Sequence, residues 1–183
     1  MINFFYDDCI ISNYEKRGEW EETISYLKSL VHSDNTDKSI FFRYAAQCWY
    51  VLTFWDCFMP KEKLSRSFFE MNMKSAYRIA KKYYWNDSNC LWLFGYFMCI
   101  NQTDFLFIDK NILEIEQMGN NLIIKAYSFD INNPLSEIMY LADNGTKQNY
   151  KNAVEKAKSS ITEKFPGDSA VDCYFREIFT HCI

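Results

Sequence analysis

Hydrophobic residues recur every three or four positions over long stretches of this chain, which is the spacing of an α-helix. The stretch 61–84 shows it most clearly, with Phe69, Met73, Ala76, Ala80 and Tyr83 on one face. Polar clusters at 32–39, 85–89, 130–134 and 165–169 separate these stretches and supply helix caps. The pattern predicts almost no strand, and helices at 4–17, 19–32, 38–57, 61–84, 88–101, 104–118, 120–128, 134–143, 146–164 and 169–181.

Three of these predicted helices share a frame in which two cysteines flank eight mostly apolar residues. They read "CWYVLTFWDC" (48–57), "CLWLFGYFMC" (90–99) and "CYFREIFTHC" (173–182). Helix positions nine apart are rotated by about 900° and displaced by roughly 13.5 Å, so the two cysteines face opposite ways. A disulfide needs Cα atoms within about 7 Å, and zinc ligands usually stand two to four residues apart. The frame therefore predicts buried structural thiols, with no metal, redox or cofactor site.

Aromatic residues occupy the same two places in each frame, four residues apart on one helix face. The pairs are Tyr50 and Phe54, Trp92 and Tyr96, and Phe175 and Phe179. The first two frames start 42 residues apart, and the third starts almost two such steps later. Candidate second helices begin at a similar spacing, near Gly18, Pro60, Thr103 and Gly145. This regularity predicts an array of helical hairpins with a period of about 42 residues.

The composition agrees with an all-α fold. The 183 residues are long enough for a real core, 49% are hydrophobic, and only five glycines and three prolines are present. Gly18, Gly119, Gly145 and Gly167 fall at expected helix ends, where a positive φ favours glycine, whereas Gly95 lies inside a helix and predicts close packing. With no visible linker, we expect one domain over 1–183 made of stacked antiparallel helical hairpins, with eight to ten helices in all.

The net charge of −4 argues against a nucleic-acid partner and favours a basic protein partner. The most apolar window, 40–59, contains Arg43, Gln47 and Asp56, so no membrane span is expected. The start, "MINFFYDDCII", lacks the features of a signal peptide. These features predict a cytoplasmic chain with reduced thiols.

The segment "YEKRGEWEETISYLKSLVHSD" (14–34) resembles the middle and end of a tetratricopeptide repeat. Tyr14 and the turn residues Gly18, Glu19 and Trp20 match the family, and Ile24 and Leu27 fall where its second helix packs. Thr23 replaces the family's small alanine, and the closing proline after Val31 is absent. In "CLWLFGYFMC", Leu91 and Gly95 have the separation usual in a first helix. The resemblance implies a curved stack of helix pairs that binds another protein, although the family's period is 34 rather than about 42 residues.

A second resemblance is to bacterial immunity proteins of contact-dependent growth inhibition systems, and it rests on size, acidity, low glycine content and the lack of a catalytic motif. It implies a cytoplasmic protein that binds a toxin domain, commonly a basic nuclease, and blocks its active site. The alternative is a general helical-repeat adaptor or regulator that binds a peptide of another protein.

Catalytic motifs are missing from the sequence. It has no glycine-rich phosphate loop, and His181 and Cys182 are adjacent, so their side chains diverge by about 100° on a helix. The basic stretch "KSAYRIAKK" (74–82) has its lysines outside the helical stripe of Tyr77, Ala80 and Tyr83, as in a solvated face. The sequence therefore predicts a protein-binding module rather than an enzyme.

The candidate partner-binding residues are polar and lie on or just after the expected first helices of the hairpins. Simple solvent exposure is the alternative for each of them. They are Asp8, Glu15, Gln47, Asp56, Asn101 and Asp104.

Overall fold

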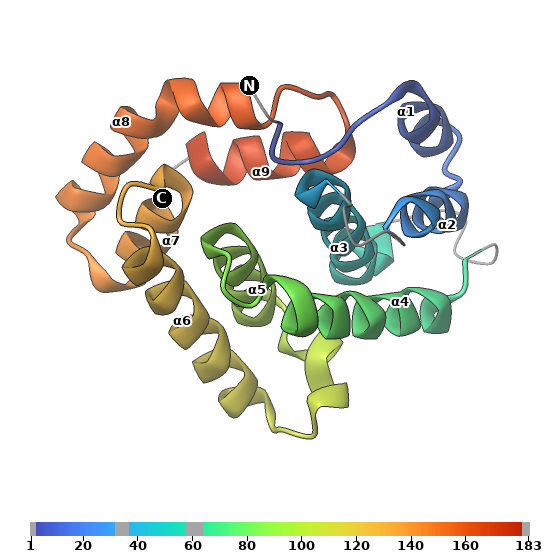
Figure 1. The fold of residues 1–183 in the computed structure, drawn as a ribbon, viewed down its shortest axis with the longest axis horizontal. Helices are drawn as coiled ribbons and strands as arrows, with labels where there is room; N and C mark the ends of the chain where they lie inside the picture. The colour runs from blue at the N-terminus through green and yellow to red at the C-terminus, as the bar shows by residue number, and fades with distance from the viewer. Residues whose placement is uncertain (1–2, 32–36, 58–63, 181–183) are drawn as a thin grey trace. The chain divides into compact units, whose positions relative to one another are not determined.

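The computed structural model describes residues 3–31, 37–57 and 64–180 (Figure 1). These residues form helices and contain no strand, which confirms the all-α prediction. The α-helices are α1 (Cys9–Lys16), α2 (Trp20–Leu30), α3 (Lys38–Thr53), α4 (Arg66–Ile79), α5 (Ser88–Ile100), α6 (Ile112–Phe129), α7 (Pro134–Asn144), α8 (Lys147–Lys164) and α9 (Ala170–Thr180). Shorter pieces are the 3₁₀ helices η1 (Trp55–Cys57) and η4 (Gln102–Ile108) and the π-helical turn η3 (Ala80–Tyr84).

The polar clusters cap the helices as the sequence predicts. The side chains of Asp37, Asp87 and Asn133 accept backbone N–H bonds at the starts of α3, α5 and α7. Ser169 accepts the Asp172 N–H at 3.0 Å where α9 begins. Each cap satisfies a donor that has no partner inside its own helix. Many of the expected boundaries are correct to within a few residues, but the helix expected at 4–17 begins only at Cys9, and the helix expected at 38–57 ends at Thr53.

One stretch departs from the prediction of helices at 104–118 and 120–128. Residues 102–108 form the 3₁₀ helix η4, and a single α-helix, α6, runs through Gly119. Asp109 separates the two with a left-handed backbone (φ 61°), and Asn111 then starts α6 in a capping box with Glu114. Gly119 was expected to end a helix, but it lies in the middle of one.

The reason for a glycine at 119 is the close approach of α5 to α6. A Cβ on Gly119 would lie 2.8 Å from the Gly95 carbonyl oxygen and 2.8 Å from Cys99 Sγ. A Cβ on Gly95 would lie 2.8 Å from the Gly119 carbonyl oxygen. The packing role expected for Gly95 is therefore confirmed, and Gly119 shares it. Of the glycines expected at positive φ, Gly145 has a φ of −105°, and Gly18 (φ 71°) is the only glycine of the described chain with a positive φ.

The chain divides into two compact units. Unit 1 comprises Met1–Tyr77 and Glu163–Phe175, and unit 2 comprises Arg78–Thr162 and Arg176–Ile183. The division falls inside the helical stretch from α4 to η3, inside α8 and inside α9. The single domain expected over 1–183 stays a prediction.

Unit 1 is built around α3, in which nearly every side chain from Phe41 to Leu52 is buried. An aromatic cluster joins its N-terminal segment to the start of α9: the rings of Phe5 and Phe175 lie 5.3 Å apart, and those of Phe165 and Phe175 lie 5.9 Å apart. The expected turn at Gly18 ends α1, and α2 begins at Trp20. The turn between two helices that the sequence predicts here is therefore present.

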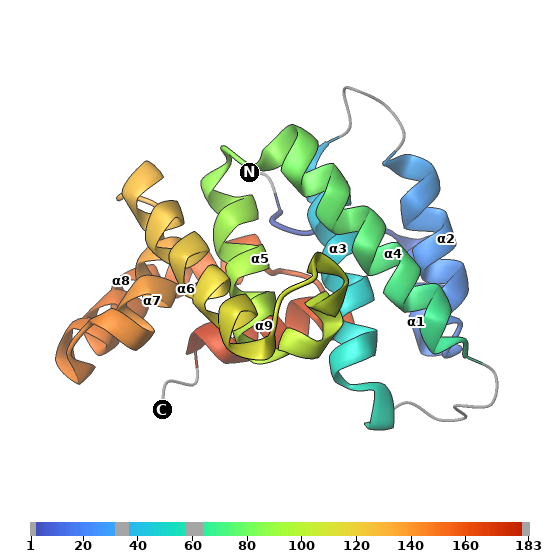
Figure 2. The ribbon, with the colours of Figure 1, turned by 90° about the horizontal axis from the view of Figure 1, so that it is seen from below.

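Unit 2 is built around α5, whose side chains from Cys90 to Met98 are all buried. Helices α6 and α7 both pack against it (Figure 2). Asn133, at the start of α7, donates to Asn89 Oδ1 at 2.8 Å, and Ser88 donates to the Ala126 carbonyl at 3.0 Å. The Tyr127 and Tyr140 rings stack at 4.6 Å between α6 and α7. These contacts fix three helices of the unit to one another.

The π-helical turn changes the expected register of the stretch 61–84. Phe69, Met73, Ala76 and Ala80 are buried as expected, but Tyr83 is 54% exposed. A π-helical turn takes about one residue more than an α-helical turn, so the positions after Ala80 are rotated away from the buried face. Pro60, expected in the first turn of this helix, lies outside the described residues.

The prediction of buried thiols in the cysteine frames is correct for Cys48 and Cys90, wrong for the exposed Cys57, and met only in part by Cys99 and Cys173, which are partly buried. All five are free thiols, and Cys182 lies outside the described residues. Trp92, Tyr96, Phe175 and Phe179 are buried, and Tyr50 and Phe54 are half-buried with rings 4.9 Å apart. The period of about 42 residues is not confirmed, because the expected second helices begin unevenly, at Trp20, Arg66, Ile112 and Lys147.

Among the described residues, no single helix is both long enough and apolar enough to span a lipid bilayer. The continuous pair α5 and η4 reaches such a composition together, but the two are bent by 109°.

The glycine contact between α5 and α6 makes a prediction about stability. We expect Gly119→Ala to destabilise the protein by up to about 2 kcal/mol in urea unfolding, because overpacking costs about 1–3 kcal/mol and the higher helix propensity of alanine returns about 1 kcal/mol. Gln117→Ala, at an exposed position of the same helix, is the control and should be nearly neutral. A Gly119→Ala protein more stable than the wild type would contradict the close approach.

Candidate functional site

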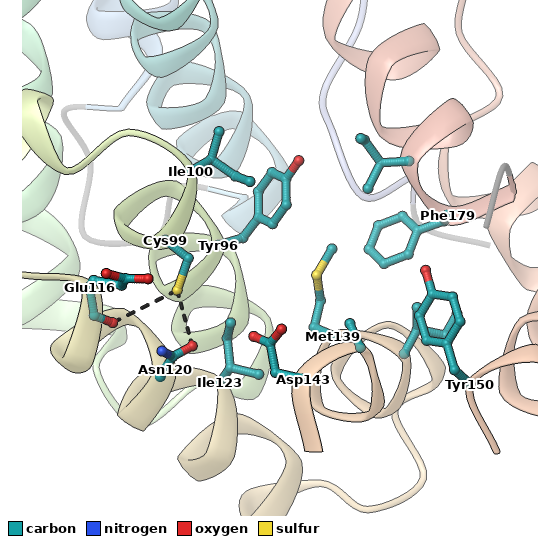
Figure 3. A pocket seen from close by; sticks show the side chains of 13 residues that line it. Tyr96, Cys99, Ile100, Glu116, Asn120, Ile123, Met139, Asp143, Tyr150 and Phe179 are labelled. Carbon is teal, nitrogen blue, oxygen red and sulfur yellow. Dashed lines mark hydrogen bonds between the residues drawn. The ribbon is translucent and has the colours of Figure 1, made fainter. Parts of the chain in front are cut away.

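The candidate site is a pocket of about 490 Å³ in unit 2, lined by residues of α5, α6, α7, α8 and α9 (Figure 3). A volume of this size lies within the range of about 300–1,000 Å³ typical of ligand sites. All thirteen lining residues belong to unit 2. The pocket is therefore a property of one compact unit.

Helices α5 and α6 form one wall of the pocket. Tyr96, Cys99 and Ile100 follow one another along the last turns of α5, and Asn120 and Ile123 come from the facing side of α6. Figure 3 shows these side chains directed toward the open space. Because Gly95 and Gly119 let the two backbones approach, the α5 and α6 residues form one continuous surface.

The opposite wall comes from α7, α8 and the end of α9. Met139 lies at the centre of the view in Figure 3, with Phe179 and Tyr150 beyond it. Phe179 is fixed by an edge-to-face contact with Trp92 at 5.6 Å between ring centroids. The floor of the pocket is therefore aromatic and aliphatic, and its side chains are held by the core of the unit.

Cys99 is the thiol among the thirteen described lining residues, and it is held as a neutral group. Its Sγ lies 3.3 Å from Asn120 Oδ1 and 3.9 Å from the Glu116 carbonyl oxygen. Burial, with smaller effects from the charges of Asp143 and Glu116, raises the pKa of the Cys99 thiol to about 12. A thiol with that pKa is protonated at neutral pH and is a poor nucleophile. The geometry suits binding better than covalent catalysis.

The charged groups of the pocket are both carboxylates. Glu116 and Asp143 are exposed, and none of the thirteen lining residues is basic. Neither carboxylate has an ion-pair partner within the described part of the chain. No group of three or more His, Cys, Asp or Glu side chains in that part is placed to hold a metal ion. The site thus combines an apolar floor with unpaired negative charge.

The six residues expected to bind a partner lie elsewhere. Asp8 caps α1, and its Oδ2 accepts the hydroxyls of Tyr6 at 2.9 Å and Tyr26 at 2.7 Å. Burial alone would raise the pKa of Asp8, but hydrogen bonds from the Ile11 N–H and from both tyrosines hold it below its ordinary value. Asp8 therefore has a structural role in unit 1.

Glu15 and Gln47 belong to a buried network around Arg43. Arg43 is fully buried, and it donates to Glu15 Oε1 at 2.5 Å, to Gln47 Oε1 at 3.1 Å and to Asp172 Oδ2 at 3.0 Å. Ser169 is a further acceptor for Arg43, at 2.6 Å. Gln47 has no exposed surface, so it is not available to a partner.

The remaining three are Asp56, Asn101 and Asp104. Asp56 is exposed in η1. Asn101 ends α5 and accepts a hydrogen bond from the Thr103 hydroxyl at 2.6 Å, and Asp104 is buried at 6% exposure. The structure gathers Glu15 and Gln47 around Arg43 but brings none of the six candidates into the pocket.

The pocket residues were missed for a specific reason. Met139, Asp143, Tyr150 and Phe179 lie on three helices that are far from α5 in the sequence. The frame 90–99 marked Tyr96 and Cys99 as packing residues, and the frame 173–182 marked Phe179 in the same way, but neither frame indicated a pocket. Helix packing decides which apolar residues remain uncovered, and the periodicity of a sequence carries no information about how helices pack.

A second, smaller cavity of about 340 Å³ lies in unit 1 beside the Arg43 network. Asp7, Glu15 and Asp168 give it acidic character, and Lys16 is its basic member. Its walls are mostly polar and lack the apolar floor of the unit 2 pocket.

Comparison of the chain with protein-family models, with curated proteins and with solved structures finds no match. The tetratricopeptide-like and immunity-protein resemblances therefore gain no support from relatives.

The buried network of unit 1 predicts a large effect of one substitution. Burial raises the pKa of Asp172, while the adjacent Arg43 opposes that rise. We expect Arg43→Met to cost about 3–5 kcal/mol of unfolding free energy at pH 7, because it leaves Glu15 and Asp172 buried without their cation.

The loss should be smaller at pH 4 than at pH 7. Without Arg43 the pKa of Asp172 in the folded protein is higher still. The variant is therefore most stable below the pKa that Asp172 has in the unfolded chain, and it loses stability as the pH rises through the pKa of Asp172 in the folded protein. Arg66→Met removes an exposed pair with Glu70 and should change stability by about 0.5 kcal/mol or less. Equal effects of the two variants in urea unfolding would rule out a structural role for the network.

The contribution of Asp8 to stability should depend on pH in the opposite direction. Since its pKa is lowered in the fold, its contribution is present above its unfolded pKa and lost as the pH falls. We expect Asp8→Ala to cost about 1–2 kcal/mol at pH 7 and less at pH 3, in thermal or urea unfolding. Asp8→Asn keeps a capping oxygen and should cost less at pH 7. A loss for Asp8→Ala that is the same at both pH values would contradict the lowered pKa.

Proposed function

We propose that this protein is a non-enzymatic protein-binding module and that the unit 2 pocket holds a segment of its partner. The observation that supports this most is the pocket itself, an apolar recess between helices that are fixed to one another. Buried apolar anchors in such pockets provide most of the energy of protein association.

The size of the pocket fits one or two side chains of a partner. Its volume of about 490 Å³ exceeds that of a single aromatic side chain, and Ile100 at its edge is 49% exposed. An anchor placed among Tyr96, Met139 and Phe179 would leave water and gain contacts with side chains that are already ordered. Preorganised walls reduce the entropic cost of binding.

The charge of the chain favours a basic partner. With a net charge of −4, it attracts a basic protein over long range and speeds the encounter. In its most specific form the proposal is an immunity protein that binds a basic nuclease domain of a toxin and neutralises it by occluding its active site. The alternative within the same class is an adaptor that binds a peptide of another protein.

The test is selection of random twelve-residue peptides displayed on phage against three versions of the full chain. Ala142 is an exposed pocket residue, so Ala142→Trp should fill the opening without disturbing the core. Ser159→Trp places the same side chain on an exposed position of α8 outside the pocket. We expect the wild type and Ser159→Trp to enrich the same peptides, and Ala142→Trp to lose at least tenfold in affinity for them.

Two outcomes would overturn the proposal. One is the absence of any enriched peptide whose binding depends on Ala142. The other is a wild-type dimer in sedimentation that Ala142→Trp converts to a monomer, because the pocket would then be covered by a second copy of the chain. Circular dichroism of both tryptophan variants shows that any loss of binding is not a loss of fold.

A further inference from the structure

The two carboxylates of the unit 2 pocket are placed differently from its apolar residues. Glu116 and Asp143 are both exposed, while Tyr96, Met139 and Phe179 are at most 7% exposed. Figure 3 shows the Asp143 side chain between the two walls, with its carboxylate toward the α5 and α6 side. The negative charge therefore lies at the opening, and the apolar surface lies below it.

The two carboxylates differ in their pairing from two acidic groups close to them in the sequence. The exposed Glu114 lies 3.5 Å from Lys110, and the partly buried Glu137 lies 3.4 Å from Lys156. Glu116 and Asp143 have no such pair within the described residues. Both also act on the same thiol, Cys99, whose pKa their charges help to raise, so both fields reach the pocket wall.

Aromatic rings add to the attraction for a cation. Tyr96, Tyr150 and Phe179 line the pocket, and Figure 3 shows all three beside the open space. A cation within about 6 Å of a ring face is attracted by the electron density of that face. A basic side chain entering this pocket would meet carboxylates at the opening and rings along the walls, while its methylene groups cover apolar surface.

We infer that the pocket recognises a segment of another protein in which a lysine or arginine stands next to a bulky apolar residue. The apolar residue occupies the floor by Met139 and Phe179, and the cation pairs with Asp143 and Glu116. This inference rests on the proposed function, and it adds the chemistry of the partner. The charge complementarity selects a basic protein segment over an acidic one, over nucleic acid and over a second copy of this acidic chain.

The experiment compares two double variants in the same phage selection. Glu116→Gln with Asp143→Asn removes both carboxylates and keeps the shape of the pocket. Glu155→Gln with Glu163→Gln changes the net charge by the same amount at exposed positions of α8 outside the pocket. We expect wild type and the α8 variant to enrich peptides with a basic residue beside Leu, Phe, Trp or Tyr, and the pocket variant to lose the basic preference.

The best enriched peptide is then synthesised with its basic residue and with Gln in that place, and affinities are measured by fluorescence anisotropy. The exchange should weaken binding to the wild type about five- to tenfold at low salt, as expected for two partly exposed charge pairs. It should have almost no effect on binding to the pocket variant. Raising the sodium chloride concentration should reduce the difference, because salt screens exposed charges.

The outcomes separate this inference from the proposed function. Peptides that depend on Ala142 but show no basic preference would overturn the inference and leave the binding site in place. A basic preference that the α8 variant loses as strongly as the pocket variant would also overturn it, because net charge alone would then be the cause. No peptide that depends on Ala142 would overturn both.

Discussion

The contact between Gly95 and Gly119 is the constraint on which the described site depends. Each glycine leaves room for the carbonyl oxygen of the other, so α5 and α6 approach at backbone distance. This approach places Cys99 against Asn120 and joins the end of α5 to α6 in one wall. Larger side chains at either position would separate the helices and change that wall. The pocket is thus a consequence of packing, and its apolar residues are held by the core beneath them.

Unit 1 uses polar groups in its interior in a different way. Arg43 connects α1, α3 and the start of α9 through Glu15, Gln47 and Asp172. A buried guanidinium is tolerated because its donors meet carboxylate, amide and hydroxyl oxygens, and such directional bonds fix which segments meet. Two of the candidate partner-binding residues, Glu15 and Gln47, belong to this network, and their polar groups bind Arg43. Polarity on an expected helix face was therefore a poor guide to exposure.

Helices were well predicted because their signals are local. Capping residues such as Asp87 and Asn133 and the apolar period need no knowledge of distant parts. The helix 112–129 was divided in error because a glycine inside a helix looks, in sequence, like a glycine that ends one. Tyr83 was misplaced because a π-helical turn leaves no clear mark in the period. The pocket joins α5 to α7 and α9, and such long-range packing is outside the reach of periodicity.

The charges at the pocket show why an exposed carboxylate can be more informative than a buried one. Asp172 and Glu15 form ion pairs with Arg43, so their charges stabilise contacts within the fold. Glu116 and Asp143 stand beside an apolar recess with no cation among the described residues. Their field is weak in water, but it strengthens when a partner excludes water from the recess, since the local dielectric constant falls. The same two groups therefore contribute little to the stability of the free protein and discriminate between partners once the apolar floor is covered.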